Sequence, residues 1–319
     1  MLQTLENADP AFRADVINGL SEPIPAIPAR WLYDRRGSEL FDQITRLATY
    51  YPSRTEAALL DTKAAEIARL TGRGGVVVEF GAGSATKTPT VLRELRPRSY
   101  VPVDISGDYL RDSAAVIDQD FPEISVYPVE ADFTRQVDLP QAVAGLSRLG
   151  FFPGSTIGNF VPRSATDLLR HFRQILGTGA KLLIGMDRVK DVKRLVSAYD
   201  DPEGVTARFN LNLLHRINRE LDGDIPIDAF RHCARWNDML SRIEMHLVPD
   251  RDVKFQVADR KFAFLAGQSI HTENSHKYGP RGARLLLLAG GWTPVAEWTD
   301  PAEDFALILA EAERERFAP

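Results

Sequence analysis

From about residue 75 onward, short apolar runs alternate with stretches in which apolar residues recur at helical spacing. This alternation is typical of parallel βαβ units. It predicts five strands, at residues 76–80, 100–104, 124–129, 151–158 and 181–187. It also predicts intervening helices, at residues 87–95, 108–117 and 165–176, the last of which is capped by Gly177. The expected fold class is therefore α/β, with a doubly wound sheet.

The remaining sequence is less regular, and neither of its two segments has the pattern of a self-sufficient domain. Residues 1–56 carry several prolines and aromatic residues, and residues 190–277 contain polar helical stretches followed by a β-like stretch. We expect 1–56 and 190–277 to form one discontinuous α+β domain that lies over the carboxyl edge of the sheet as a lid. The sheet domain then comprises 57–189 and 278–319, with residues 292–310 returning to the sheet as helix, turn and closing strands.

The composition allows a sizeable core, because 44% of the residues are hydrophobic and 26% are charged. The net charge is −5 and the charges are mixed along the chain, which disfavours a nucleic-acid partner. The single cysteine, Cys233, cannot form an internal disulfide, so a reducing compartment is expected. Residues 1–10 lack a basic, apolar leader, and no stretch approaches the roughly 18 apolar residues of a membrane span. We expect a cytoplasmic monomer without a membrane partner.

The first predicted strand runs into a glycine-rich loop that contains Gly81 and Gly83. Glycines at a strand-to-helix turn allow a ligand to approach the backbone closely, and a plain tight turn without a ligand is the alternative interpretation. The dinucleotide fingerprint has a third glycine where this chain has Thr86. This difference argues against an NAD-dependent oxidoreductase, which stays open as a third hypothesis.

Acidic residues at the ends of the next two strands make the loop more informative. Asp104 ends the second strand, where a carboxylate can accept hydrogen bonds from both ribose hydroxyls of a nucleoside. Asp132 ends the third strand, where it can accept the adenine amino group while Phe133 covers the ring. Each acid alone is also typical of a helix cap or a solvated turn. Together with the loop, they indicate a class I methyltransferase that binds S-adenosylmethionine.

Several separated stretches resemble the histidine-specific methyltransferases of ergothioneine biosynthesis, in order and over nearly the whole chain. The five most specific are Trp31-Leu32-Tyr33-Asp34, Leu40-Phe41-Asp42-Gln43-Ile44-Thr45, Tyr50-Tyr51-Pro52-Ser53-Arg54-Thr55-Glu56, Gly154-Ser155-Thr156-Ile157-Gly158-Asn159 and Thr272-Glu273-Asn274-Ser275. Further similarity runs through Ala198-Tyr199-Asp200-Asp201, Phe209-Asn210, Asn218-Arg219-Glu220-Leu221 and Arg242-Ile243-Glu244-Met245. These stretches are unusual among methyltransferases at large.

The resemblance implies a Rossmann-like methyltransferase domain with a separate substrate domain. It implies S-adenosylmethionine as the cofactor, without a metal, and the matching positions are Tyr33, Gly81, Lys87, Asp104, Asp132 and Phe133, to which the loop adds Gly83. It implies free L-histidine as the substrate, and the matching positions are Tyr50, Phe41, Gly154, Asn159, Tyr199, Met245, Glu273 and Ser275. By this resemblance, Asn159 and Tyr199 bind the substrate carboxylate, and Glu273 and Ser275 bind its imidazole.

The chemistry of these residue types is compatible with those roles. Glu273 and Ser275 are two residues apart, so in an extended segment both side chains project from the same face. A carboxylate accepts one imidazole N–H and a hydroxyl serves the other nitrogen, whereas an indole offers only one donor. Asn159 follows the fourth predicted strand, and its amide can donate to a carboxylate. An exposed polar turn at Glu273 and Ser275, and core positions for Tyr33, Tyr50 and Tyr199, are the competing interpretations.

We expect Tyr33 to lie nearest the reacting amine and to orient it as the catalytic residue. The resemblance implies three successive transfers, which give Nα,Nα,Nα-trimethyl-L-histidine (hercynine) as the first step toward ergothioneine. Two further hypotheses stay open: an N-methyltransferase of another amino acid, such as tryptophan or a modified histidine, and a non-catalytic protein that kept the fold. None of the histidines has a recognised metal-binding spacing, and His276 has no assigned role. The glycine-rich stretch 279–282 is expected at the closing edge of the lid.

Overall fold

The computed structural model describes residues 9–312, which divide into two compact units. The α+β unit contains the described residues up to Tyr50 together with Asp191–Ser275. The sheet unit contains Tyr51–Lys190 together with the described residues from His276 onward. The expected boundaries fall after residues 56, 189 and 277. The largest difference is at the first boundary, because helix α4 (Tyr51–Thr71) is continuous and belongs entirely to the sheet unit.

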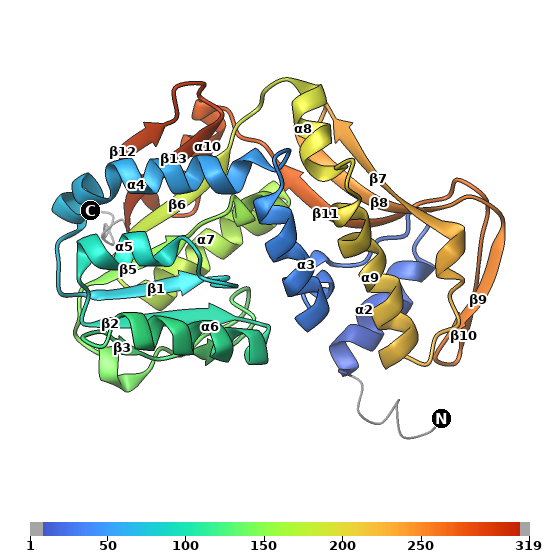
Figure 1. Cartoon of the computed structure of the whole chain (residues 1–319), viewed down its shortest axis with the longest axis horizontal. Helices are drawn as coiled ribbons and strands as arrows, with labels where there is room; N and C mark the ends of the chain where they lie inside the picture. The colour runs from blue at the N-terminus through green and yellow to red at the C-terminus, as the bar shows by residue number, and fades with distance from the viewer. Residues whose placement is uncertain (1–8, 313–319) are drawn as a thin grey trace, which may run out of the picture. The chain divides into compact units, whose positions relative to one another are not determined.

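The sheet unit is built on one large sheet, whose strands follow the order β12-β13-β6-β5-β1-β2-β3, with β4 also paired to β2 (Figure 1). The bounds are β1 Val76–Phe80, β2 Ser99–Asp104, β3 Ser125–Val126, β4 Val129–Glu130, β5 Arg148–Phe152, β6 Lys181–Asp187, β12 Trp292–Thr299 and β13 Phe305–Ala312. The strands from β6 to β3 pair in parallel, whereas β13 pairs antiparallel with both β6 and β12. The expected fold class, a doubly wound α/β sheet, is confirmed.

Alternate residues of β1 explain how helices cover both faces of this sheet. Val76, Val78 and Phe80 pack in one apolar cluster with residues of α7 (Pro162–Leu176) and α10 (Pro280–Ala289). Val77 packs in a second cluster with residues of α4, α5 (Thr88–Leu95) and α6 (Gly107–Asp120). Because successive strand residues point to opposite faces, an unbroken apolar run is what a sheet buried on both sides requires. The carboxyl ends of the strands are thereby held at fixed positions.

Two predicted strands differ from the observed ones. The fourth strand was expected at 151–158, but β5 ends at Phe152. Gly154 and Ser155 then have φ values of +78° and +56°, in the left-handed region, and a short 3-10 helix η3 (Thr156–Asn159) follows. Left-handed residues cannot continue a strand, so the extended prediction beyond Phe152 was wrong. The third strand, expected at 124–129, is interrupted and forms the two short strands β3 and β4.

The carboxyl-terminal part of the described chain also differs from the expectation. A helix was expected within 292–310, but this range contains only β12, a turn and most of β13. The helix comes earlier, because Gly279 caps α10 and Pro280 occupies its first position, which is favourable for proline. The glycine-rich stretch 279–282 therefore starts a helix of the sheet unit and is not the edge of a lid.

The α+β unit combines helices from both chain segments with a small sheet of order β11-β8-β7 (Figure 1). Its helices are α2 Pro10–Ser21, η1 Ala29–Leu32, α3 Arg35–Arg46, α8 Val192–Tyr199, α9 Val205–Glu220 and η4 Ile227–Ala229. Its strands are β7 Phe230–Asn237, β8 Arg242–Pro249 and β11 Ile270–His276, together with the hairpin β9 Val253–Val257 and β10 Arg260–Phe264. A bridge between Ala26 and His271 joins the amino-terminal segment to β11. This bridge connects the two distant chain segments within the α+β unit.

Candidate active site

Aromatic residues from both segments of the α+β unit form a cluster of rings. The ring centroids of Tyr33 and Phe41 are 5.6 Å apart, those of Phe41 and Tyr50 are 6.2 Å apart, and those of Tyr50 and Tyr199 are 5.8 Å apart. Phe209 joins the cluster at 5.4 Å from Tyr33. The sequence singled out four of these five rings as site residues. Phe209 was noted only as part of a similar stretch.

Two polar pairs connect this aromatic cluster to strand β11. The Tyr33 hydroxyl donates to Glu273 Oε1 at 3.2 Å, and the hydroxyls of Tyr199 and Ser275 are hydrogen-bonded at 2.7 Å. Glu273 and Ser275 are both buried. Their alternation along the strand puts them on one face, as expected, and that face meets the tyrosines. An exposed polar turn at these positions is excluded.

The contact between Tyr199 and Ser275 joins two residues that the sequence assigned to different ends of the substrate. The sequence suggested that Tyr199 serves the carboxylate end of a substrate and Ser275 serves the imidazole end. A direct hydrogen bond between the two hydroxyls makes them one polar pair.

Tyr33 is a hydrogen-bond donor in this site. Burial, followed by the nearby Glu273 carboxylate, raises the pKa of the Tyr33 phenol well above its ordinary value. The phenol therefore stays protonated near neutral pH, and its proton points to Glu273. Orientation through hydrogen bonding suits such a group, whereas proton abstraction does not.

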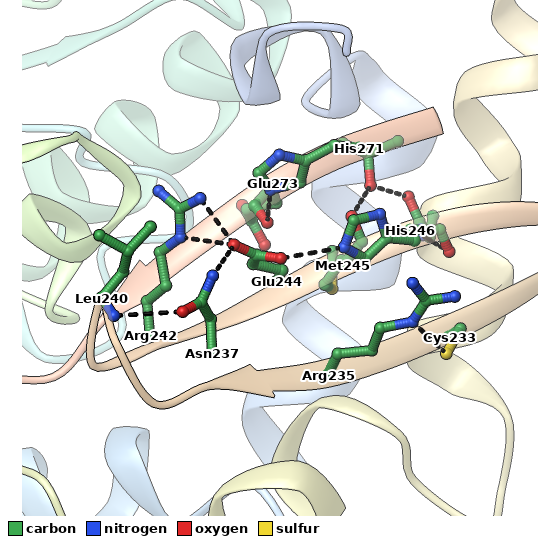
Figure 2. A network of polar contacts seen from close by, with 12 residues as sticks. Cys233, Arg235, Asn237, Leu240, Arg242, Glu244, Met245, His246, His271 and Glu273 are labelled. Atoms are coloured by element: carbon green, nitrogen blue, oxygen red, sulfur yellow. Dashed lines mark hydrogen bonds and ion pairs between the residues drawn. The ribbon is translucent and has the colours of Figure 1, made fainter. Parts of the chain in front are cut away.

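A second layer of polar residues lies beside Glu273 and the buried Met245 of β8 (Figure 2). Glu244 accepts hydrogen bonds from Asn237 at 2.9 Å and from Arg242 at 2.8 Å, and despite the cost of burial these contacts lower its pKa to about 2. The rings of His246 and His271 stack with centroids 4.9 Å apart. His271 Nε2 lies 3.0 Å from the carbonyl oxygen of Glu273, to which it donates. This network supports the strand segment that carries Glu273.

The glycine loop of the sheet unit lies over the end of β2. Gly81 and Gly83 both have positive φ values, +72° and +49°. The Gly83 N–H donates to Asp104 Oδ2 at 3.0 Å, and the Ser106 N–H donates to Asp104 Oδ1 at 2.9 Å. Burial raises the pKa of the Asp104 carboxyl, while these two N–H groups favour its charged form. An ionised carboxylate at this position is an acceptor, which fits the hydroxyl donors of a ribose.

Phe133 lies against the same loop. A Cβ atom added to Gly81 would come 3.4 Å from the Phe133 ring, so the absence of a side chain there leaves room beside the ring. The ring also packs 5.7 Å from that of Phe152 in the core of the sheet. Asp132 accepts from the backbone N–H of Thr134 at 3.0 Å. This arrangement of a partly buried ring and an adjacent carboxylate fits an adenine base.

Lys87 belongs to a contact set that the sequence did not predict. Its ammonium forms an ion pair with Glu56 of α4, and the Gly154 N–H donates to the same carboxylate oxygen, Glu56 Oε2, at 2.8 Å. Glu56 is fully buried, and a Cβ atom on Gly185 of β6 would come 2.0 Å from its other oxygen. Gly185 thus provides the space in which Glu56 holds the glycine loop and the loop after β5 together.

Two expected substrate residues, Gly154 and Asn159, belong to the sheet unit, whereas the others belong to the α+β unit. Asn159 is the last residue of η3, beyond the end of β5. His276 donates from Nδ1 to the carbonyl oxygen of Gly158 at 2.9 Å. This contact holds the residue next to Asn159 and gives His276 a structural role that its sequence position did not reveal.

A sequence profile described as histidine-specific methyltransferase, SAM-dependent, matches residues 12–312. The chain belongs to this family. Its methyl donor is accordingly S-adenosylmethionine, and the oxidoreductase and non-catalytic hypotheses are set aside.

Three relatives illustrate the range of this family. A histidine N-alpha-methyltransferase of Mycobacterium tuberculosis is 42% identical over 94% of this chain and 94% of its own. Ergothioneine biosynthesis protein 1 of Neurospora crassa is 27% identical over 90% of this chain and 33% of its own. A 4-dimethylallyltryptophan N-methyltransferase of Epichloe festucae var. lolii is 26% identical over 91% of this chain and 92% of its own.

Within residues 9–312, the side chains of His, Cys, Asp and Glu form no group of three or more that could hold a metal ion. No helix in that part of the chain is both long and apolar enough to cross a bilayer.

Proposed function

We propose that this protein transfers methyl groups from S-adenosylmethionine to the α-amino nitrogen of free L-histidine. The observation that carries this proposal is the buried pair of Glu273 and Ser275 on one face of β11, in contact with Tyr33 and Tyr199. A carboxylate and a hydroxyl at this spacing are complementary to the two nitrogens of an imidazole. The relative from M. tuberculosis, which is named for histidine, supports the same substrate.

The remaining substrate residues complete the proposed pocket. Asn159 donates its amide N–H to the substrate carboxylate, together with the Tyr199 hydroxyl. Tyr50, Phe41, Met245 and Gly154 line the pocket around the side chain and the amine. Tyr33 is proposed as the residue nearest the reacting nitrogen, and it also contacts the cofactor.

The cofactor supplies a methyl carbon that is activated by a sulfonium leaving group. The main task of the chain is therefore to align a neutral amine with that carbon and to exclude water, so positioning accounts for most of the rate. Tyr33 orients the amine by hydrogen bonding, and its ring faces the methylated ammonium that is formed. The clustered rings of Tyr33, Phe41 and Tyr50 suit such a cation.

Three successive transfers are proposed, which give Nα,Nα,Nα-trimethyl-L-histidine (hercynine), the first intermediate on the way to ergothioneine. Anchoring of the substrate through its carboxylate and imidazole leaves the amine free to rotate between transfers. The Neurospora crassa relative, which is named for ergothioneine biosynthesis, supports this assignment.

We propose that the sheet unit binds the cofactor and the α+β unit carries most of the substrate residues. The proposed cofactor residues are Tyr33, Gly81, Gly83, Lys87, Asp104, Asp132 and Phe133. The hydrogen bonds from Gly83 and Ser106 to Asp104 support this assignment, because they fix the carboxylate under the glycine loop. A cytoplasmic monomer that acts on a small molecule completes the proposal.

The test is to incubate the purified protein with S-adenosylmethionine and one amino acid at a time, and to measure product masses. Histidine should gain one, two and then three methyl groups, and tryptophan should gain none at matched concentration. Absence of any gain on histidine would contradict the proposal. Methylation of tryptophan alone would instead support the second candidate function, N-methylation of another amino acid such as tryptophan. The relative from Epichloe festucae var. lolii favours this alternative.

A further inference from the structure

Asn210 lies in the middle of α9, and its side chain is completely buried. Its Nδ2 atom lies 2.9 Å from His232 Nδ1 and 3.2 Å from the carbonyl oxygen of His246. Its Oδ1 atom accepts a hydrogen bond from the Thr272 hydroxyl at 2.7 Å. One amide thus uses both its donor hydrogens and its acceptor within the interior of the α+β unit.

Each partner of Asn210 leads to a residue of the proposed substrate pocket. His232 Nε2 lies 2.8 Å from the carbonyl oxygen of Tyr199, which closes α8. The Thr272 hydroxyl is also 3.1 Å from the carbonyl oxygen of Met245, on β8. Thr272 immediately precedes Glu273 on β11. Three elements that each carry a pocket residue are therefore tied to the same amide.

The orientation of this amide is fixed by its neighbours. The carbonyl oxygen of Tyr199 only accepts, so His232 Nε2 carries the hydrogen and Nδ1 presents a lone pair to Asn210. Reversal of the amide would put its oxygen against that lone pair and against the carbonyl oxygen of His246. Burial lowers the pKa of His232, which keeps the imidazole neutral as this pattern requires.

We propose that Asn210 is a positioning residue for substrate selectivity. It holds Tyr199, Met245 and the segment around Glu273 in the relative positions that binding of an imidazole requires. This inference rests on the proposed function, which it deepens. Asn210 does not itself touch the substrate in this account. It acts through His232 and Thr272. His232 is hydrogen-bonded to the backbone carbonyl of Tyr199, and Thr272 of β11 contacts the backbone carbonyl of Met245. These contacts fix the backbone from which the pocket side chains extend.

Asn210→Asp and Thr272→Val test this role from two directions. The first replaces the donating NH2 group by oxygen, and the second removes the hydroxyl while keeping the shape of the side chain. Each leaves buried polar groups without partners, so we expect the kcat/KM for L-histidine to fall about tenfold or more. Binding of S-adenosylhomocysteine, measured by calorimetry, should change less than about twofold. Thr272→Ser, which keeps the hydroxyl, should retain most of the activity.

The decisive readout is selectivity, which a merely structural role would not move. L-Histidine and L-tryptophan are placed in competition for each variant, and the ratio of their binding constants is compared with that of the wild-type protein. The matched control is Asn218→Asp, because Asn218 is on the same helix. Its amide nitrogen and amide oxygen are both hydrogen-bonded to the backbone of Ile225, each at 2.9 Å. The control should lower the melting temperature without changing the ratio.

Several outcomes would overturn the role of Asn210. One is an unchanged ratio of the histidine and tryptophan binding constants in both Asn210→Asp and Thr272→Val. Another is a change of that ratio in Asn218→Asp as large as in these variants. The third is a loss of cofactor binding as large as the loss of histidine binding. Because Thr272→Val is nearly isosteric, the test holds even where Asn210→Asp does not fold. Failure of the wild-type protein to bind or methylate histidine would instead contradict the proposed function itself.

Discussion

The phenol oxygen of Tyr33 lies 3.2 Å from Oε1 of Glu273, across a separation of 240 residues in the sequence. The proposed catalytic residue and the proposed imidazole-binding residue therefore form one hydrogen-bonded pair. The pair constrains both roles, because the Tyr33 hydroxyl presents its proton to the Glu273 carboxylate. If these proposed roles hold, this contact couples orientation of the amine to recognition of the imidazole.

Replacement of Tyr33 by phenylalanine should show this coupling. Removal of the hydroxyl leaves Glu273 Oε1 without its donor, so we expect kcat/KM for histidine to fall about tenfold. Steady-state methylation assays with varied histidine measure this effect. Tyr127→Phe is the control, since Tyr127 packs against the core of the sheet unit, and its kinetics should match those of the wild-type protein. A Tyr33→Phe variant with unchanged kcat/KM would contradict the proposed role of the hydroxyl.

Glu273→Ala and Asp104→Ala should have opposite effects on the two ligands. Glu273 lies on β11 and Asp104 ends β2 under the glycine loop. We expect Glu273→Ala to weaken histidine selectivity more than cofactor affinity, and Asp104→Ala to do the reverse. Calorimetric titration of each variant with histidine and with S-adenosylhomocysteine separates the two effects. Equal losses for both ligands in both variants would refute this division of labour.

Glu56 should matter for cofactor binding although it is fully buried. Glu56→Gln keeps the size of the side chain but removes the charge that pairs with Lys87, so the ion pair that anchors Lys87 is lost. We expect the Kd for S-adenosylhomocysteine to rise about tenfold. Glu66→Gln on the same helix is the control, because Glu66 only faces Lys63 at the surface, at 4.0 Å. If Glu56→Gln raises the Kd for S-adenosylhomocysteine as much in a Lys87→Ala background as in the wild-type protein, Glu56 does not act through Lys87.

The stability of the protein should depend on pH through His246. Burial, followed by the neighbouring His271, lowers the pKa of His246 to about 4. In the unfolded chain the imidazole has its ordinary pKa near 6.5, so between about pH 6.5 and 4 the unfolded state binds more protons. The free energy of unfolding should therefore fall by up to about 3 kcal/mol as the pH drops through this window.

Denaturant unfolding at a series of pH values measures this effect. His246→Gln should flatten the pH dependence between 6.5 and 4, whereas substitution of the exposed His215 by glutamine should leave it unchanged. Glu244 affects stability in a separate pH range. Its pKa is about 2 in the folded protein, so its contribution to the free energy of unfolding is lost only as the pH falls below about 4.5. Identical slopes for the wild-type protein and His246→Gln would contradict the role of His246.

The central sheet was predictable because its strands are short apolar runs separated by helical patterns. β1 and β6 were predicted with the observed bounds. The end of β5 was not, because the break depends on left-handed backbone angles at Gly154 and Ser155, and serine gives little local signal for such a conformation. The interruption between β3 and β4 likewise depends on how each short segment pairs with β2.

Residues of the candidate site could be proposed from the sequence where a motif carries its own chemistry. The glycine loop, Asp104 and the spacing of Glu273 and Ser275 are local signals, and they were recognised. Residues that act through distant partners were missed, such as Asn210, whose partner Thr272 is 62 residues away, and Glu56, whose partner Lys87 is 31 residues away. Their motifs were noted, but burial and hydrogen bonding between distant segments decide what such residues do. These properties emerge only from the folded structure.

Binding of free amino acids to the protein with S-adenosylhomocysteine present tests the central claim most directly. Calorimetric titration with L-histidine and with L-tryptophan is carried out on the wild-type protein and on Glu273→Ala. The account predicts that the wild-type protein binds histidine in clear preference to tryptophan, and that Glu273→Ala loses most of this preference. Equal or tighter binding of tryptophan to the wild-type protein, or an unchanged preference in Glu273→Ala, would contradict it.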